Sequence, residues 1–160
     1  FAPQFSGERI PTLSEALQEI QRLGMGLNLE IKHDGPGLER LVATVLSTLA
    51  LEWRDSDKLL LSSFNHQALR LCRNQAPHLR RGQLYEVVPA NWQQELQEID
   101  AYSLHCDYQA LDAMLARSIK AAGYRLLCYT VNDPQAVARH WGWGMDAIFT
   151  DDPARFLGNE

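Results

Sequence analysis

The chain of 160 residues is long enough for one domain with a buried core, and 46% apolar with 22% charged residues is an ordinary globular composition. Its 15 basic and 20 acidic residues give a formal charge of -5, which argues against nucleic acid or an anionic membrane held by bulk electrostatics. No apolar run approaches the roughly 18 residues that a membrane-spanning helix requires. We therefore expect residues 1–160 to form a single domain.

The three cysteines, Cys72, Cys106 and Cys128, are widely separated and odd in number. They form no C-x-x-C pair, so the sequence indicates neither a zinc site nor a disulfide framework. A cytoplasmic location in a reducing compartment fits this usage best, and a processed secreted chain stays open as the alternative.

Helices and strands are expected to alternate along the chain. After an irregular lead-in over residues 1–10, Thr12 and Glu15 have the spacing of a helix capping box, and Gly24 ends the apolar stripe that follows. Strands are then predicted at residues 26–32, 58–63, 79–88, 101–106, 124–131 and 146–150, with helices at 38–49, 65–74, 91–99, 111–122 and 134–141.

The strand over residues 26–32 changes from apolar to chemically reactive along its length. Its apolar residues alternate with Asn28, Glu30 and Lys32, so the carboxylate and the ammonium project from the same face. Such a pair at a strand end can hold a hard metal ion together with an anionic group. A salt bridge on a solvated strand face is the other interpretation of the same spacing.

Six strands alternating with helices predict an α/β fold with a parallel sheet and right-handed crossovers. Two architectures compete, an open doubly wound sheet and a closed (βα) barrel. No G-x-G-x-x-G or G-x-x-x-x-G-K-[ST] motif is present, which removes the best support for a nucleotide-binding or redox open sheet. A closed barrel of eight units needs about 200 residues or more, so six units would form an incomplete barrel.

Polar residues follow several of the predicted strands, and in parallel α/β folds these strand ends share one edge of the sheet. Ser63 and Asn132 fit caps or turns as well as ligands, and His105 fits a buried interior histidine as well as a substrate contact. No order of Ser, His and Asp and no G-x-S-x-G motif indicates a nucleophile. The strand-end residues are Glu30, Lys32, Ser62, Ser63, Phe64, Tyr85, Glu86, His105, Tyr129, Thr130, Asn132, Thr150 and Asp151.

Several segments, in the right order along the chain, resemble the glycerophosphodiester phosphodiesterase family. Each is weak alone, and the combination is specific. They are G-E-R-I-P-T-L-S-E-A-L at 7–17, L-E-I-K at 29–32, L-S-S-F at 61–64, C-Y-T-V-N-D at 128–133 and G-M-D-A-I-F-T-D-D-P at 144–153.

The resemblance implies a TIM barrel that uses Mg2+ or Ca2+ to hydrolyse glycerophosphodiesters to an alcohol and sn-glycerol 3-phosphate. Glu30 matches a metal-ligand position of the family, and Lys32 matches the catalytic cation beside the phosphoryl group. Tyr129 stands where many relatives carry Trp, so substrate shaping there differs. Ser63 and His105 are the further substrate-binding candidates.

A larger departure from the family than Tyr129 concerns four of its motifs. Members carry H-R-G, E-N-T, E-x-D and H-D motifs ahead of the part that this chain resembles, and residues 1–160 contain none of them in that position. These motifs supply the acid/base histidines, the phosphate-binding arginine and most metal ligands. We therefore expect six of eight barrel units, or about three quarters of a member, with little or no activity in isolation. His33 and Asp34 follow the E-I-K strand, so they do not match the H-D motif.

A function of a different class remains open, namely a non-catalytic barrel fragment that serves binding or assembly. The open side of such a fragment exposes apolar strand edges, which predicts homo-oligomer formation.

Overall fold

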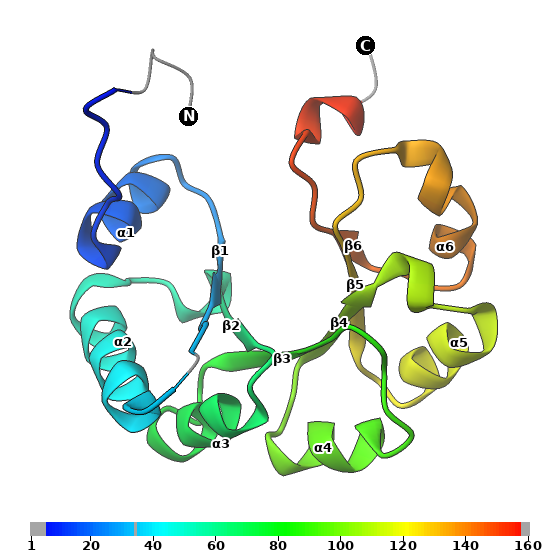
Figure 1. Ribbon diagram of the computed structural model, residues 1–160, viewed down its shortest axis with the longest axis horizontal. Coiled ribbons are helices and arrows are strands. Elements are labelled where there is room, and N and C mark those ends of the chain that lie inside the picture. Colours follow the sequence, from blue (N-terminus) through cyan, green and yellow to red (C-terminus); the bar gives the residue numbers. More distant parts are fainter. Residues whose placement is uncertain (1–5, 34, 158–160) are drawn as a thin grey trace.

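The computed structural model describes residues 6–33 and 35–157 and consists of one curved sheet with helices along its convex side (Figure 1). Within the described residues, six strands pair in chain order, and every neighbouring pair is parallel. The strands are β1 (Leu27–Glu30), β2 (Leu59–Ser63), β3 (Arg80–Tyr85), β4 (Ser103–Asp107), β5 (Arg125–Tyr129) and β6 (Ala147–Ile148).

At least one helix connects each strand to the next. The α-helices are α1 (Leu13–Arg22), α2 (Leu38–Glu52), α3 (His66–Gln75), α4 (Trp92–Glu98), α5 (Ala113–Ala121) and α6 (Ala138–Gly142). Short 3-10 helices lie at Ser56–Lys58, Tyr108–Ala110, Pro134–Val137 and Pro153–Arg155. Within the described part of the chain, no helix has the length and apolar character that crossing a bilayer demands.

This arrangement is half of a (βα) barrel. A doubly wound sheet reverses its strand order at a switch point and carries helices on both faces. Here the order runs from β1 to β6 without reversal, and the helices lie outside the arc of the sheet (Figure 1). The predicted α/β fold with six parallel strands of an incomplete TIM-type barrel is therefore confirmed, and the open sheet is excluded.

The first helix begins as its sequence predicts. Thr12 and Glu15 form a complete capping box, with the Thr12 amide donating to the Glu15 carboxylate over 2.7 Å and the Glu15 amide donating back to the Thr12 hydroxyl over 3.3 Å. After the helix, Gly24 adopts a φ of 71°, the left-handed conformation that favours glycine at a helix end.

Several strands are shorter than predicted. The strand expected over 26–32 is only Leu27–Glu30, because beyond Glu30 the chain leaves the ladder after one last bond from the Ile31 amide to the Ser62 carbonyl. The strand expected over 79–88 ends at Tyr85, and the one expected over 146–150 is assigned only at Ala147–Ile148. The helix expected over 134–141 is a 3-10 turn followed by α6. These differences are at element ends, where periodicity carries the least information.

Two apolar clusters fill the space between the sheet and the helices. The first joins β1 and β2 to α1, α2 and α3, with Leu17, Val42 and Leu61 fully buried. The second joins β4 and β5 to α4 and α5, with Leu96 and Leu126 fully buried. Between the clusters, β3 directs buried polar side chains toward α3 and α4, which explains why its sequence lacks regular apolar alternation.

Arg81 is the buried cation of β3 and joins the ends of two helices. Its guanidinium contacts the residues that follow the C-terminal ends of α3 and α4, and its side chain is only 3% exposed. It also approaches the Asp100 carboxylate at 3.2 Å. The Arg81 guanidinium donates to the backbone carbonyl oxygens of Ala76, Pro77, Leu79, Ile99 and Asp100. These hydrogen bonds satisfy carbonyl groups that helix ends leave without partners.

We expect Arg81→Met to destabilise the fold by about 3 to 5 kcal/mol, because it leaves buried carbonyl oxygens and Asp100 without their donor. Arg80→Met is the matched control. Arg80 is partly exposed and pairs with the exposed Asp57, so its loss should cost under about 1 kcal/mol. Urea unfolding of the two variants measures the difference. Equal stability of both variants would contradict the role given to Arg81.

Asp146 directly precedes β6 and links the beginning of that strand to α5 and β5. Its carboxylate accepts hydrogen bonds from the Leu126 amide and Arg125, each over 2.8 Å, and from Lys120. Partial burial raises the pKa of the Asp146 carboxyl, but these donors outweigh that effect and hold the pKa below its ordinary value of 3.8. The ionised carboxylate therefore stabilises the folded chain.

We expect Asp146→Asn to lower the free energy of unfolding by roughly 1 to 2 kcal/mol at neutral pH. Because the folded pKa is depressed, this stabilisation is complete above the unfolded pKa of 3.8 and is lost as the pH falls through the lower folded pKa. The difference from the unmodified chain should therefore shrink in acid unfolding experiments, whereas Asp57→Asn, at an exposed carboxylate, should show little difference at any pH. A difference for Asp146→Asn that persists at low pH would refute this assignment.

Candidate active site

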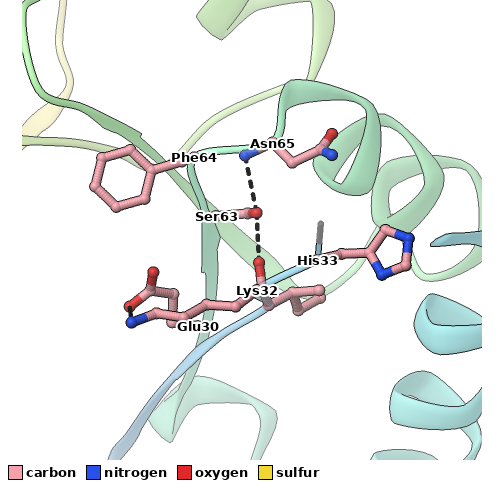
Figure 2. A pocket seen from close by; sticks show the side chains of 7 residues that line it. Glu30, Lys32, His33, Ser63, Phe64 and Asn65 are labelled. Carbon is pink, nitrogen blue, oxygen red and sulfur yellow. Dashed lines mark hydrogen bonds and ion pairs between the residues drawn. The ribbon is translucent and has the colours of Figure 1, made fainter. Parts of the chain in front are cut away.

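Two adjoining cavities open at the carboxyl ends of the strands. The α3 cavity, of about 460 Å³, lies beside the start of α3 (Figure 2), and the β5 cavity, of about 350 Å³, reaches Tyr129 on β5. Glu30, Lys32 and Phe64 line both cavities. The other lining residues are Ile31, His33, Ser63 and Asn65 in the α3 cavity, and Asn28, Leu84, Tyr129, Thr130 and Phe149 in the β5 cavity.

Glu30 and Lys32 form an ion pair at the end of β1. The Glu30 Oε2 atom lies 3.7 Å from the Lys32 Nζ atom, beyond hydrogen-bond length. The Lys32 side chain is 78% exposed, whereas that of Glu30 is 29% exposed. The pair is therefore loose, and Lys32 remains available to an incoming anion.

The other carboxylate oxygen of Glu30 has no such partner. Glu30 Oε1 is buried without a hydrogen-bond donor among the described residues, and so is Oδ1 of Asn28, which projects from the same face of β1 two residues earlier. Leaving a buried acceptor unpaired costs about 1 to 3 kcal/mol. These are hard oxygen atoms of the kind that Mg2+ and Ca2+ take as ligands, so Glu30 and Asn28 fit part of the ligand set of a divalent cation.

Tyr129 presents its ring to the β5 cavity. Its hydroxyl donates to the Tyr85 carbonyl over 2.7 Å, and its ring meets Phe64 edge-on with centroids 5.9 Å apart. Burial raises the pKa of the Tyr129 phenol, so it stays neutral at physiological pH. Tyr129 therefore shapes the cavity through its aromatic surface.

Ser63 lies at the end of β2 with its hydroxyl already engaged. The hydroxyl donates to the Ile31 carbonyl over 2.6 Å and accepts from the Asn65 amide over 3.0 Å (Figure 2). It thereby joins the end of β1 to the turn that leads into α3. Its substrate-binding role stays a prediction.

His105 is not at a strand end, because β4 continues to Asp107. The ring is fully buried, with Nε2 at 2.9 Å from the Ser103 hydroxyl and Nδ1 without a partner among the described residues. A Cβ atom on Gly82 would lie 2.5 Å from Nε2, so the glycine makes room for the ring. Burial lowers the pKa of His105 to about 4, and the ring is neutral at pH 7. It lines neither cavity, and its substrate contact also stays a prediction.

Two further strand-end residues hold loops together. His33 approaches the Gly35 carbonyl at 2.5 Å through Nε2. The Asn132 amide oxygen accepts from the Thr150 hydroxyl and the Asp151 amide, and its nitrogen donates to the Asp151 carboxylate over 3.0 Å. Asn132 thus links the segment that follows β5 to the segment that follows β6 by hydrogen bonds.

Sequence reasoning assigned no site role to Phe64 or Asn28. Phe64 is 46% exposed and lies between the two cavities, and Asn28 shares the face of Glu30. The position of Asn28 two residues before Glu30 was the signal available for it. Phe64 offered only its place after the Ser62-Ser63 strand end.

The described residues bring together few metal-ligating side chains. Within 6–33 and 35–157, no group of three or more His, Cys, Asp or Glu residues is arranged to hold a metal ion. Glu30 is therefore one carboxylate beside an amide oxygen, rather than part of a complete acidic cluster.

Comparison with known proteins identifies relatives along nearly the whole chain. The model of the glycerophosphoryl diester phosphodiesterase family matches residues 1–155. A glycerophosphodiester phosphodiesterase of Caldanaerobacter subterraneus subsp. tengcongensis is 35% identical over 161 residues, which cover 98% of this chain and 64% of that protein. One of Bacillus subtilis is 30% identical over 164 residues, covering 96% of this chain and 55% of that protein.

Solved structures agree with the sequence matches. An Oleispira antarctica phosphodiesterase, solved in complex with the product sn-glycerol-3-phosphate, superposes with a TM-score of 0.89 at 36% identity over 92% of this chain and 60% of its own. The chain thus spans 55% to 64% of the length of these relatives, less than the expected three quarters. The family match over residues 1–155 and the superposition of the half-barrel agree with each other. The chain belongs to the glycerophosphoryl diester phosphodiesterase family.

Proposed function

We propose that this chain supplies the metal-binding and phosphate-binding side of a site that hydrolyses glycerophosphodiesters to an alcohol and sn-glycerol 3-phosphate. The observation that carries the proposal is Glu30 Oε1, buried and unpartnered at a strand end, next to the exposed ammonium of Lys32. An anion-binding cation beside a free carboxylate oxygen is the combination that metal-assisted phosphodiester hydrolysis requires. Membership of the family supports the same reaction.

Glu30 would hold the metal ion, Mg2+ or Ca2+, and the Asn28 amide oxygen on the same face of β1 would help. Such an ion, when bound, polarises a phosphoryl oxygen as a Lewis acid. Lys32, whose side chain is exposed and only loosely paired with Glu30, would bind the phosphate and offset the negative charge that develops during the reaction.

The aromatic residues would set the shape of the substrate. Phe64 and Tyr129 meet edge-on between the two cavities and offer apolar surface to the glycerol or the alcohol. Ser63 would act on substrate through the turn that it holds, since its O–H hydrogen is already donated to the Ile31 carbonyl. His105 would support the floor below the β5 cavity.

Proton transfer to the leaving alcohol needs a further group. Of the described histidines, only His33 lines a cavity with Glu30, and its ring is engaged with the Gly35 carbonyl. We therefore assign the general acid and base to residues outside this chain. On its own, the chain should show little or no turnover.

A chimera tests the proposal, with this chain replacing the matching part of the Oleispira antarctica phosphodiesterase. We expect the chimera to release sn-glycerol 3-phosphate from glycerophosphocholine with Mg2+ or Ca2+ but not with EDTA. Glu30→Gln should lower kcat/KM by about 100-fold or more, because the amide removes the charge that binds the metal. Glu39→Gln, at the exposed start of α2, is the matched control and should be active.

Full activity of the Glu30→Gln chimera would remove Glu30 from the site. A folded chimera without any turnover would favour the alternative, a non-catalytic module. The observation behind that alternative is that β1 and β6 each pair on one side only within the described residues, which leaves two strand edges for a second copy.

A further inference from the structure

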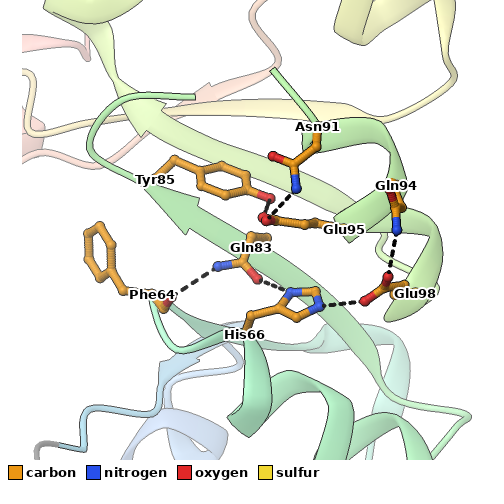
Figure 3. A network of polar contacts seen from close by, with 8 residues as sticks. All are labelled: Phe64, His66, Gln83, Tyr85, Asn91, Gln94, Glu95 and Glu98. Carbon is orange, nitrogen blue, oxygen red and sulfur yellow. Dashed lines mark hydrogen bonds and ion pairs between the residues drawn. The ribbon is translucent and has the colours of Figure 1, made fainter. Parts of the chain in front are cut away.

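A hydrogen-bond network lies behind the turn that carries Phe64, on the helix side of the sheet (Figure 3). At its centre is Gln83 on β3, whose side chain is buried. Its amide nitrogen donates to the carbonyl oxygens of Ser63 and Phe64, each over 3.2 Å, and to that of Leu84 over 3.1 Å. Of these acceptors, Ser63 is the last residue of β2, and Phe64 is the first residue of the segment that leads to α3.

These donations fix the orientation of the Gln83 amide. Because the nitrogen faces carbonyl oxygens, the amide oxygen points the other way and accepts from Nδ1 of His66 over 3.0 Å (Figure 3). Nε2 of His66 lies 3.3 Å from the Glu98 carboxylate on α4, which is also an acceptor. His66 thus lies between the Gln83 amide and the Glu98 carboxylate, with one ring nitrogen facing each.

The partner of His66 on α4 is a carboxylate. From α4, Glu98 faces the ring, and its other oxygen accepts from Gln94 over 3.1 Å. The bonds from Gln94 and His66 lower the pKa of the Glu98 carboxyl, so it is ionised at neutral pH. The positive charge of Arg70 on α3 also contributes to the lowered pKa of Glu98.

We propose that Gln83 is a positioning residue for the candidate site, oriented by His66 and Glu98. By holding the Ser63 and Phe64 carbonyls, it fixes a turn of two residues between the end of β2 and the start of α3. Phe64 is half exposed, and its ring stands edge-on to Tyr129 between the two cavities. Gln83 itself lines neither cavity, so it acts on substrate only through Phe64.

The variant Gln83→Glu tests the donors directly, because it keeps the size and shape of the side chain and replaces the NH2 group by an acceptor. Gln83→Met is the second variant, with the same length and no polar atom. The matched control is Gln94→Met, which removes another amide of the network but no bond to the turn.

The first readout uses the isolated chain of 160 residues and does not depend on catalysis. In both Gln83 variants we expect loss of the nuclear Overhauser effect between the Phe64 and Tyr129 rings. We also expect amide hydrogen exchange at Asn65 to be at least about tenfold faster, while Leu126 in the core is unchanged. Gln94→Met should retain the contact and the protection. Retention of both in Gln83→Glu would overturn the proposal, and so would equal loss in the control.

The second readout rests on the proposed function and uses the chimera. Gln83→Glu should raise the KM for glycerophosphocholine by about tenfold with kcat nearly unchanged, since a displaced Phe64 weakens binding without touching the reacting atoms. An equal fall in kcat with KM unchanged would overturn this role. If the parent chimera is inactive, the proposed function fails, and the ring contact and the Asn65 exchange still decide the role of Gln83.

Discussion

Parallel pairing of the strands in chain order is the constraint on which the rest of the structure depends. Each strand runs the same way, so the ends of β1, β2 and β5 meet at one edge although they are far apart in sequence. Glu30, Lys32, Phe64 and Tyr129 come together there without any local sequence motif to join them. The same pairing leaves the helices on the convex side of the sheet (Figure 1). The candidate site lies at the carboxyl ends of the strands.

The outer face of β3 carries polar residues where the neighbouring strands carry apolar ones. Arg81 satisfies the carbonyl ends of α3 and α4 at one end of the strand, and Gln83 holds the turn before α3 toward the other. Both side chains are almost fully buried, and both use backbone carbonyls as acceptors. Fully satisfied buried polar groups of this kind specify one arrangement of their neighbours, which is what a site assembled from several loops needs.

The fold was largely predictable because its signals are local and periodic. The capping box of Thr12 and Glu15 and the alternation around Glu30 depend on neighbours within a few residues. The sequence left His105 open between a buried interior histidine and a substrate contact, because its burial depends on β4 extending to Asp107 and on the space that Gly82 leaves for the ring. The place of Phe64 between two cavities was also hidden, because it arises from contact with Tyr129, which is distant in sequence.

The most direct measurement of the central claim is a crystal structure of the chimera grown with Ca2+ and sn-glycerol 3-phosphate, with anomalous scattering used to place the metal. We expect Ca2+ at about 2.3 to 2.6 Å from a Glu30 carboxylate oxygen. The phosphate should lie beside Lys32. A metal bound away from Glu30, or a phosphate bound away from Lys32, would contradict the assignment of this edge of the sheet as the metal and phosphate site.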